Sequence, residues 1–380
     1  MTGRERIQAA FALREADRVP CYEQSIASDV ASALLGRPAF TGTTLLHYEE
    51  AVAWSHGDDA HAAFETQLYD DLIAIHRALG LDMIHVPWRR NVKPTQRLDA
   101  YNFLYGDPDG DHEVWRFSPE AKTFHRATVH RTSPPATDPD ALEPGIERLE
   151  ANVAAVNEYE IPEHDWSLRL QRDVGEDLEV CIGGGLSVPL DTLWLVACSL
   201  RPDLVGRYLD ALVTQNLRLA AAWRRHGFTI VWGGGDMADN RGPVYSPRTF
   251  HELVLPRVQR YVEGLHQLGM KYVFRTDGNL QPIADDFFQH SGIDGYGEID
   301  YDAGMRIPEI RARYPHVTCW GDVPCGSLLH RGTAEQVSEF VKRRLDECRG
   351  GGWILGSSNS IVPGTPPENV VAMFETAQRA

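Results

Sequence analysis

The stretch from Lys271 to Ser360 decides the fold of this chain. It contains KYVFRTDGN (271–279), GYGEID (295–300), VTCWGDV (317–323) and WILGSSNS (353–360). Each piece is a short apolar run that ends in glycine and polar or charged residues, and segments with helical spacing separate the pieces. Buried strands that alternate with helices predict a parallel sheet with crossover connections.

The same rhythm continues towards the N-terminus and gives eight strands in all. We place them near residues 19–23, 81–86, 178–182, 228–232, 271–275, 295–299, 317–321 and 353–357. A helical segment follows each strand, and eight βα units predict an α/β fold of the TIM-type (β/α)8 barrel class, as one domain over residues 1–380. A doubly wound open sheet is the alternative, and it is less favoured because no GxGxxG motif follows the first strand.

Residues 91–175 interrupt this rhythm after the second strand. The sequence DPDG at 107–110 is a strong turn, and residues alternate in character on both sides of it. We therefore expect a β-containing insertion that covers one face of the barrel. A long insertion at the carboxyl end of a strand is usual for a lid or a specificity element.

Composition and charge narrow the classes of partner. The chain has 43% hydrophobic and 24% charged residues and a net charge of −17, which argues against nucleic acid and anionic membranes as partners. No apolar run approaches the roughly 20 residues that a membrane span needs. The N-terminal segment shows no signal-peptide pattern, and the six cysteines are scattered without a CxxC pair. We therefore expect reduced thiols and a cytoplasmic protein with a small-molecule substrate.

Charged side chains follow the predicted strands where each strand ends. Arg275 is a candidate clamp for a carboxylate or phosphate, and the alternative is an internal ion pair with Asp277 or Glu298. Asp277 lies in a TDGN turn and is a candidate general acid or base or a hard-metal ligand, although turn capping is also consistent with it. Glu298, two residues before Asp300, is a candidate proton donor because paired carboxylates raise one pKa. These three, Arg275, Asp277 and Glu298, are the catalytic candidates.

A second group of residues is expected to line the mouth of the barrel and contact the substrate. Its members lie at or just after other strand ends: Tyr22, Glu23, Arg89, Asp236, Asp300, Asp322 and Asn359. His85 is interpreted differently, because it alternates with Ile84 and Val86 in an apolar run. That pattern favours a core histidine over a ligand.

A series of short motifs occurs in a fixed order along the chain. They are DRVP (17–20), GGD (234–236), YSP (245–247), TDGN (276–279), GDV (321–323) and ILGSSN (354–359). Together they resemble the uroporphyrinogen decarboxylase superfamily, most densely after residue 228. The resemblance implies a (β/α)8 fold and a small organic substrate, and relatives are often homodimers.

Two departures from the superfamily pattern restrict what the resemblance implies. Uroporphyrinogen decarboxylases carry an arginine-rich motif after the first strand, whereas this chain has CYEQS at 21–25. Zinc-dependent methyltransferases of the superfamily use His-x-Cys and a further Cys as ligands, but Arg275, Asp277 and Asn359 stand at those places. A guanidinium cannot bind a metal, and the site has no thiolates. We therefore expect a divergent member that lacks the zinc ligands, with no metal.

Three functions remain open at this stage. The resemblance favours methyl transfer or demethylation, with or without a corrinoid-binding partner protein. The second is a cofactor-independent decarboxylase, in which an arginine holds a carboxylate and a carboxylic acid supplies a proton. The third is a catalytically inactive barrel that binds a ligand or a partner.

Overall fold

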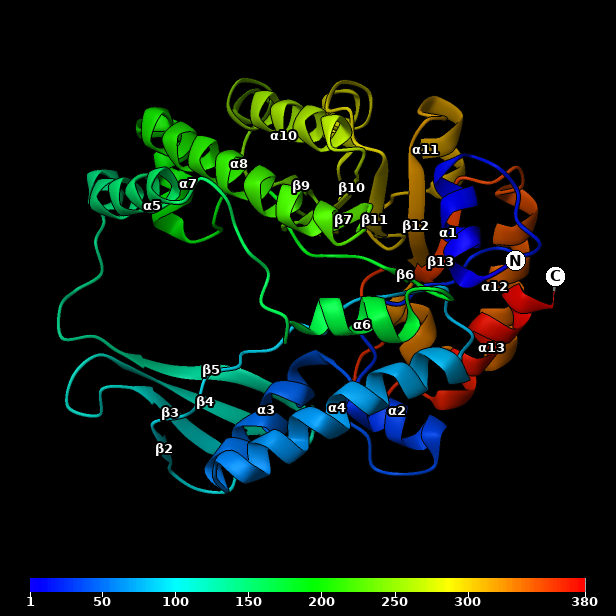
Figure 1. Cartoon of the computed structure of the whole chain (residues 1–380), viewed down its shortest axis with the longest axis horizontal. Helices are drawn as coiled ribbons and strands as arrows, with labels where there is room; N and C mark the ends of the chain where they lie inside the picture. The colour runs from blue at the N-terminus through cyan, green and yellow to red at the C-terminus, as the bar shows by residue number, and fades with distance from the viewer. Residues whose placement is uncertain (380) are drawn as a thin grey trace.

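The computed structural model describes residues 1–379 and is an α/β fold with parallel sheets (Figure 1). Its parallel strands are β1 (Met83–Ile84), β6 (Glu179–Val180), β7 (Ile230–Gly234), β10 (Lys271–Arg275), β11 (Gly295–Ile299), β12 (Thr318–Val323) and β13 (Trp353–Ser357). The predicted strands at 271–275, 295–299 and 353–357 are confirmed at both ends, whereas those at 81–86 and 178–182 are shorter than predicted.

Helices follow or precede these strands through most of the chain. They are α1 (Gly3–Phe11), α2 (Ser28–Leu35), α3 (Thr43–Ser55), α4 (Asp58–Ala78), α5 (Glu143–Ala155), α6 (Trp166–Val174), α7 (Thr192–Leu200), α8 (Pro202–Arg225), α9 (Pro247–Thr249), α10 (Leu255–Gln267), α11 (Ile307–Arg313), α12 (Ala334–Glu347) and α13 (Pro367–Gln378). Shorter 3-10 and π turns are η1 (Pro139–Leu142), η2 (Phe250–Val254), η3 (Gln281–Ile283), η4 (Asp285–His290) and η5 (Cys325–His330). None of the helices within residues 1–379 is long and apolar enough to cross a membrane.

The parallel strands form two sheets with single bridges between them. One sheet has the order β13-β12-β11-β10-β7, and the other pairs β1 with β6. Cys21 bridges Leu355 of β13, and Ile182 bridges Val231 of β7. The backbone N–H of Asp82 also donates to the carbonyl of Cys21 at 2.7 Å, just before β1.

The predicted first strand, near 19–23, is reduced to the bridge at Cys21. Pro20 has no N–H to donate, so the ladder with β13 cannot extend through it. Its carbonyl still accepts from Leu355, and Tyr22 donates its N–H to the carbonyl of Leu355 at 2.9 Å. The segment therefore runs beside β13 although it is too short for a strand.

The predicted β-containing insertion is a four-stranded antiparallel sheet. Its strands are β2 (Gln96–Arg97), β3 (Asn102–Gly106), β4 (His112–Ser118) and β5 (Thr123–His130). The DPDG turn joins β3 to β4, and the N–H of Gly110 donates to the carbonyl of Asp107. Figure 1 shows this sheet beside α3, against which it buries Phe103, Tyr105, Phe117 and Phe124.

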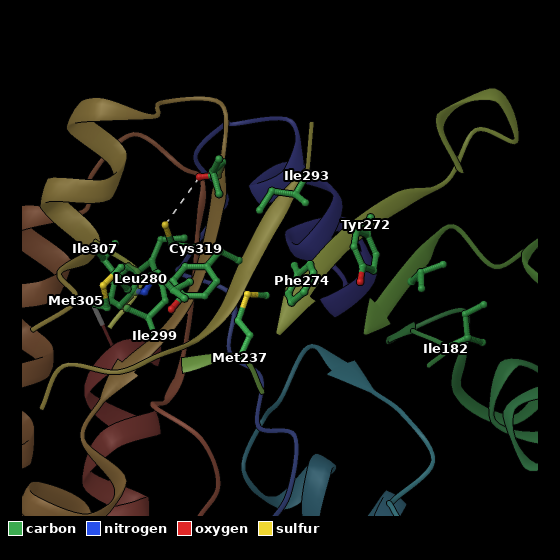
Figure 2. Packing of buried hydrophobic residues seen from close by; sticks show 14 of the residues in the cluster. Ile182, Met237, Tyr272, Phe274, Leu280, Ile293, Ile299, Met305, Ile307 and Cys319 are labelled. Carbon is green, nitrogen blue, oxygen red and sulfur yellow. Dashed lines mark hydrogen bonds between the residues drawn. The ribbon is translucent and has the colours of Figure 1, made fainter. Parts of the chain in front are cut away.

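The five-stranded sheet has a buried face on each side. Tyr272 and Phe274 of β10 pack in the cluster shared with the helices, as Figure 2 shows. Val273 points to the opposite side and joins a second cluster with Trp232 and Trp320. That inner cluster takes residues from α1 and from six of the seven parallel strands or their ends: Ile7, Ala10, Phe11, Tyr22, Met83, Cys181, Ile230, Trp232, Val273, Trp320 and Ile354. Because side chains alternate along a strand, Arg275 lies on the same side as Val273.

Candidate functional site

A cavity of about 660 Å³ opens at the carboxyl ends of β1, β6, β7 and β10. Its wall is formed by strand-end residues and by the segments that follow β1 and precede α6. Among these are His85, Pro87, Trp88, Arg89, Pro162, His164, Trp166, Cys181, Gly183, Trp232 and Arg275. Such a volume suits one small organic molecule, and aromatic rings with a few polar groups are the usual lining of such a pocket.

Arg275 ends β10 and reaches the wall of this cavity. Its Nη1 donates to Gln24 Oε1 at 2.6 Å and to Glu298 Oε1 at 3.2 Å. Its Nε is buried and has no hydrogen-bond partner within residues 1–379. The side chain is 33% exposed, and its Nη2 makes no hydrogen bond within residues 1–379, so Nη2 is the nitrogen that a ligand carboxylate can contact.

Glu298 faces Arg275 because the backbone of β11 is irregular. Strict alternation would put Glu298 on the same side as Tyr296, which packs among the helices. Glu298 instead has a φ of 64°, and the register with β12 shifts between Tyr296 and Ile299. A bulge of this kind redirects a side chain, and a non-glycine residue with positive φ is typical of functional sites. Glu298 is only 5% exposed, and burial raises its pKa while Arg275 opposes that shift.

Asp277 occupies the turn after β10 and has no cationic partner within residues 1–379. Asn359, after β13, donates its Nδ2 to Asp277 Oδ2 at 3.2 Å. Burial raises the pKa of Asp277, and the nearby negative charges of Asp236 and Asp300 raise it further. Both carboxyl groups therefore have raised pKa values, and Asp277 differs from Glu298 in having no cation beside it within residues 1–379.

Tyr22 and His85 connect the inner cluster with the cavity. The Tyr22 hydroxyl lies 3.0 Å from His85 Nδ1, and the Tyr22 ring packs against Trp232 at 4.8 Å between ring centroids. Tyr22 is fully buried, whereas His85 is half-buried and lines the cavity. Burial, together with the positive charge of Arg275, lowers the pKa of His85 to about 3, so its imidazole is neutral at physiological pH.

Glu23 lies behind this wall, between the first segment and β13. It is 1% exposed, and both the N–H and the hydroxyl of Ser357 donate to it at 3.0 Å. Burial raises the pKa of Glu23 from 4.5 to about 8. Its carboxyl group therefore contacts Ser357 and not the cavity.

Two predicted contact residues are engaged by other parts of the protein. Asp322 is fully buried and accepts hydrogen bonds from Arg344 of α12 at 3.1 and 3.2 Å. Arg89 lines the cavity, but its guanidinium donates to Glu50 at 2.5 Å and to Glu65 at 2.8 Å. These contacts favour structural roles for both side chains.

Two residues beside Arg275 were not among the sequence-based candidates. Gln24 binds Arg275 and Glu298 with its two amide ends and also donates to the carbonyl of Asn359 at 2.8 Å. Its only signal in the sequence is its place after the first strand. His85 was interpreted as a core residue because its neighbours are apolar, but β1 ends at Ile84, so the alternation stops before it.

The donor set does not suit thiol-activating zinc. Within residues 1–379, no group of three or more His, Cys, Asp or Glu side chains is arranged to hold a metal ion. Five of the six cysteines are buried, and burial raises the pKa of Cys325, the half-buried one. A zinc site of this type needs thiolates or imidazoles that converge on one point, and Arg275 occupies the middle of the site.

Comparisons with known proteins extend the sequence resemblance. Residues 193–380 match the family described as Uroporphyrinogen decarboxylase (URO-D). The chain is 25% identical to the uroporphyrinogen decarboxylase of Rhodospirillum rubrum over 178 residues, which are 46% of this chain and 48% of that protein. It is 24% identical to that of Geobacter metallireducens over 180 residues, 47% of this chain and 50% of the relative. The chain thus matches about half the length of these curated relatives.

One solved structure resembles the whole chain. A methyltransferase from Methanosarcina mazei superposes with a TM-score of 0.64 and 17% sequence identity, covering 100% of this chain and 99% of that one. At this identity the similarity is one of fold.

Proposed function

The chain belongs to the uroporphyrinogen decarboxylase superfamily, and from this premise we propose that it is an enzyme that decarboxylates a small organic acid without a cofactor. The observation that carries the proposal is the Nη2 of Arg275, which has no protein acceptor within residues 1–379 and belongs to a partly exposed side chain in the cavity wall. A bound carboxylate would accept a charge-assisted hydrogen bond from this nitrogen, and such bonds are stronger than those between neutral groups.

The proposal includes a TIM-type (β/α)8 barrel, formed by the segment at Cys21 and the seven parallel strands. The bridge from Ile182 to Val231 connects the two sheets on one side. On the other side the Cys21 segment connects them, through its bridge to Leu355 and the hydrogen bond from the N–H of Asp82 to the carbonyl of Cys21. The inner cluster supports it further, since residues from nearly every strand meet on one side of the sheets. In such barrels the catalytic groups lie at the carboxyl ends of the strands, where the cavity opens.

In the proposed mechanism each polar residue has a separate task. Glu298 and Gln24 hold the Nη1 of Arg275, so the guanidinium is fixed and its Nη2 is left for the substrate. Arg275 binds and orients the carboxylate of the substrate. The carbon–carboxylate bond breaks, carbon dioxide leaves, and the electron pair remains on the substrate. Asp277, whose raised pKa favours the acid form, transfers a proton in that form to the resulting carbanion and regains a proton from water.

Methyl transfer or demethylation is the second candidate function. The whole-chain similarity in fold to a methyltransferase supports it, and a corrinoid-binding partner protein would then be an acceptor or donor of the methyl group. Decarboxylation is preferred because Arg275 keeps Nη2 free in the cavity wall and Asp277, whose charge acts on the neighbouring Glu298, can supply a proton, whereas methyl transfer explains neither. An inactive binding barrel is less favoured, because Asp277 has no ion-pair partner among residues 1–379 that would consume its charge.

The test is a screen of small carboxylic acids for release of carbon dioxide, followed by variants of the two catalytic candidates. We expect Arg275→Ala to lower kcat/KM by about 100-fold or more and Asp277→Asn to lower kcat with little change in KM. Wild-type activity should fall as the pH rises through the pKa of Asp277, because the proton donor is then lost.

Exposed residues of the same types provide the controls. Arg248→Ala and Asp346→Asn change side chains in surface ion pairs, and neither should alter activity. Full activity in Arg275→Ala would refute the proposal. Methyl release without carbon dioxide would favour the second candidate.

A further inference from the structure

We propose that His85 donates its Nε2–H to the carbonyl oxygen of the substrate, and that the substrate is therefore a 3-oxo acid or a close analogue. This inference rests on the proposed function and deepens it by naming the substrate class. Decarboxylation without a cofactor needs a place for the electron pair that the departing carboxylate leaves behind. A carbonyl group at the 3-position accepts that pair as an enolate, and a fixed hydrogen-bond donor stabilises the enolate oxygen.

The hydrogen bond between Tyr22 and His85 determines which ring nitrogen carries the proton. Tyr22 is fully buried, and within residues 1–379 its hydroxyl has one hydrogen-bond partner that meets normal geometry, His85 Nδ1 at 3.0 Å. If Nδ1 carried the proton, the Tyr22 O–H would be left buried without an acceptor, apart from the neighbouring thiol of Cys181, a weak one. Tyr22 therefore donates to Nδ1, and the neutral imidazole carries its proton on Nε2.

The position of the ring directs that proton to the cavity. His85 lines the cavity together with Arg275, and its Nε2 has no hydrogen-bond partner within residues 1–379. His85 and Arg275 line the same cavity, so the two groups can contact one small molecule, and the positive charge of Arg275 lowers the pKa of His85. A neutral imidazole is the form suited to this task, because it polarises a carbonyl group without transferring a full positive charge to the site.

The step balances without a further reactant. The bond between C2 and the carboxylate carbon breaks, and carbon dioxide leaves. The electron pair left on C2 is delocalised onto the carbonyl group at C3 as an enolate, whose oxygen accepts a hydrogen bond from His85 Nε2. Asp277 then gives its proton to C2, and the carbonyl group is restored. The product is a ketone with one proton gained and one carbon dioxide lost.

Binding of two isosteric probes tests the inference without knowledge of the natural substrate. Malonamate has a carboxylate and an amide carbonyl, whereas 3-methylbutanoate has the same shape with no carbonyl oxygen. We expect calorimetry to show that the wild-type protein binds malonamate about 10-fold more tightly, the usual value of one good hydrogen bond. His85→Phe should abolish this preference and keep the affinity for 3-methylbutanoate. His85→Gln should keep most of the preference, because its amide nitrogen can take the place of Nε2.

Further measurements separate His85 from the carboxylate clamp and from folding. His266→Gln, a change at an exposed histidine, is the matched control and should leave both affinities unchanged. Arg275→Met should weaken the binding of both probes equally. If both affinities stay unchanged while the His85-dependent preference persists, the role of Arg275 in binding the carboxylate is refuted and this inference is not. Nitrogen NMR should find His85 neutral and protonated on Nε2 between about pH 5 and 8, and Tyr22→Phe should disturb that state. A preference that survives His85→Phe, a wild-type protein that does not prefer malonamate, or a proton on Nδ1 would overturn the inference.

Discussion

Charged groups are arranged differently at the two ends of the parallel strands. At the amino ends, Asp82 is 1% exposed and accepts from Arg6 at 3.0 Å, from Arg18 at 2.7 and 2.9 Å and from the N–H of Cys21 at 2.8 Å. At the carboxyl ends, Asp277 has one amide donor and no cation within residues 1–379. The comparison teaches that full pairing of a buried charge indicates a structural role, whereas an incompletely paired one indicates a site for a ligand.

The largest expected effect on stability comes from removing Asp82, whose carboxylate is fully paired at the amino ends of the strands. In Asp82→Ala, Arg6 and Arg18 lose the buried carboxylate that pairs with both of them. We therefore expect the free energy of unfolding to fall by about 3 to 5 kcal/mol. Urea denaturation followed by circular dichroism measures it. A loss below about 1 kcal/mol would show that this group does not hold the amino ends together.

The second effect concerns pH and the buried carboxyl group of Glu23. Its pKa is higher in the folded protein, about 8, than the ordinary 4.5, so the folded state binds more protons between these values. Stability from this group is complete below about pH 4.5 and is lost as the pH rises through 8, at a rate of at most about 1.4 kcal/mol for each pH unit. Urea denaturation from pH 5 to 8 should show this decline in the wild-type protein and a flatter profile in Glu23→Gln. Parallel profiles for the two proteins would contradict the prediction.

The third effect is small for stability and large for activity. Asp277→Asn removes a charge that has no cationic partner and that other carboxylates repel, so the free energy of unfolding should change by less than about 1 kcal/mol or rise. Activity, by contrast, should be lost. Equal losses of stability in Asp277→Asn and Asp82→Ala would remove the distinction between the two ends.

The smallest effect lies within the amino-end group itself. Asp17 also pairs with Arg6, at 2.6 Å, but its side chain is 43% exposed. We expect Asp17→Asn to cost less than about 1 kcal/mol, since water screens such pairs. Comparing the thermal denaturation of Asp17→Asn with that of Asp82→Ala shows whether burial, and not the number of ion pairs, determines how much each carboxylate contributes to stability.

The sequence by itself determined several of the parallel strands and predicted candidate site residues at their carboxyl ends. Apolar runs that end at glycine and a charged residue predicted β10, β11 and β13 at their observed bounds, because buried strands leave a strong local pattern. The DPDG turn predicted the hairpin between β3 and β4 for the same reason. The family resemblance also came from the sequence, since short motifs survive where overall identity is low.

Only the tertiary structure decided which of these side chains meet. Glu298 faces Arg275 because of a left-handed residue and a register shift in β11, which no local pattern shows. Gln24 contacts Arg275, and His85 lines the cavity with it, because packing brings distant segments together, whereas Asp322 turns to Arg344 of α12. Local sequence encodes which residues form a strand, but contacts between segments hundreds of residues apart depend on packing, and packing determines whether a charged group is paired or left for a ligand.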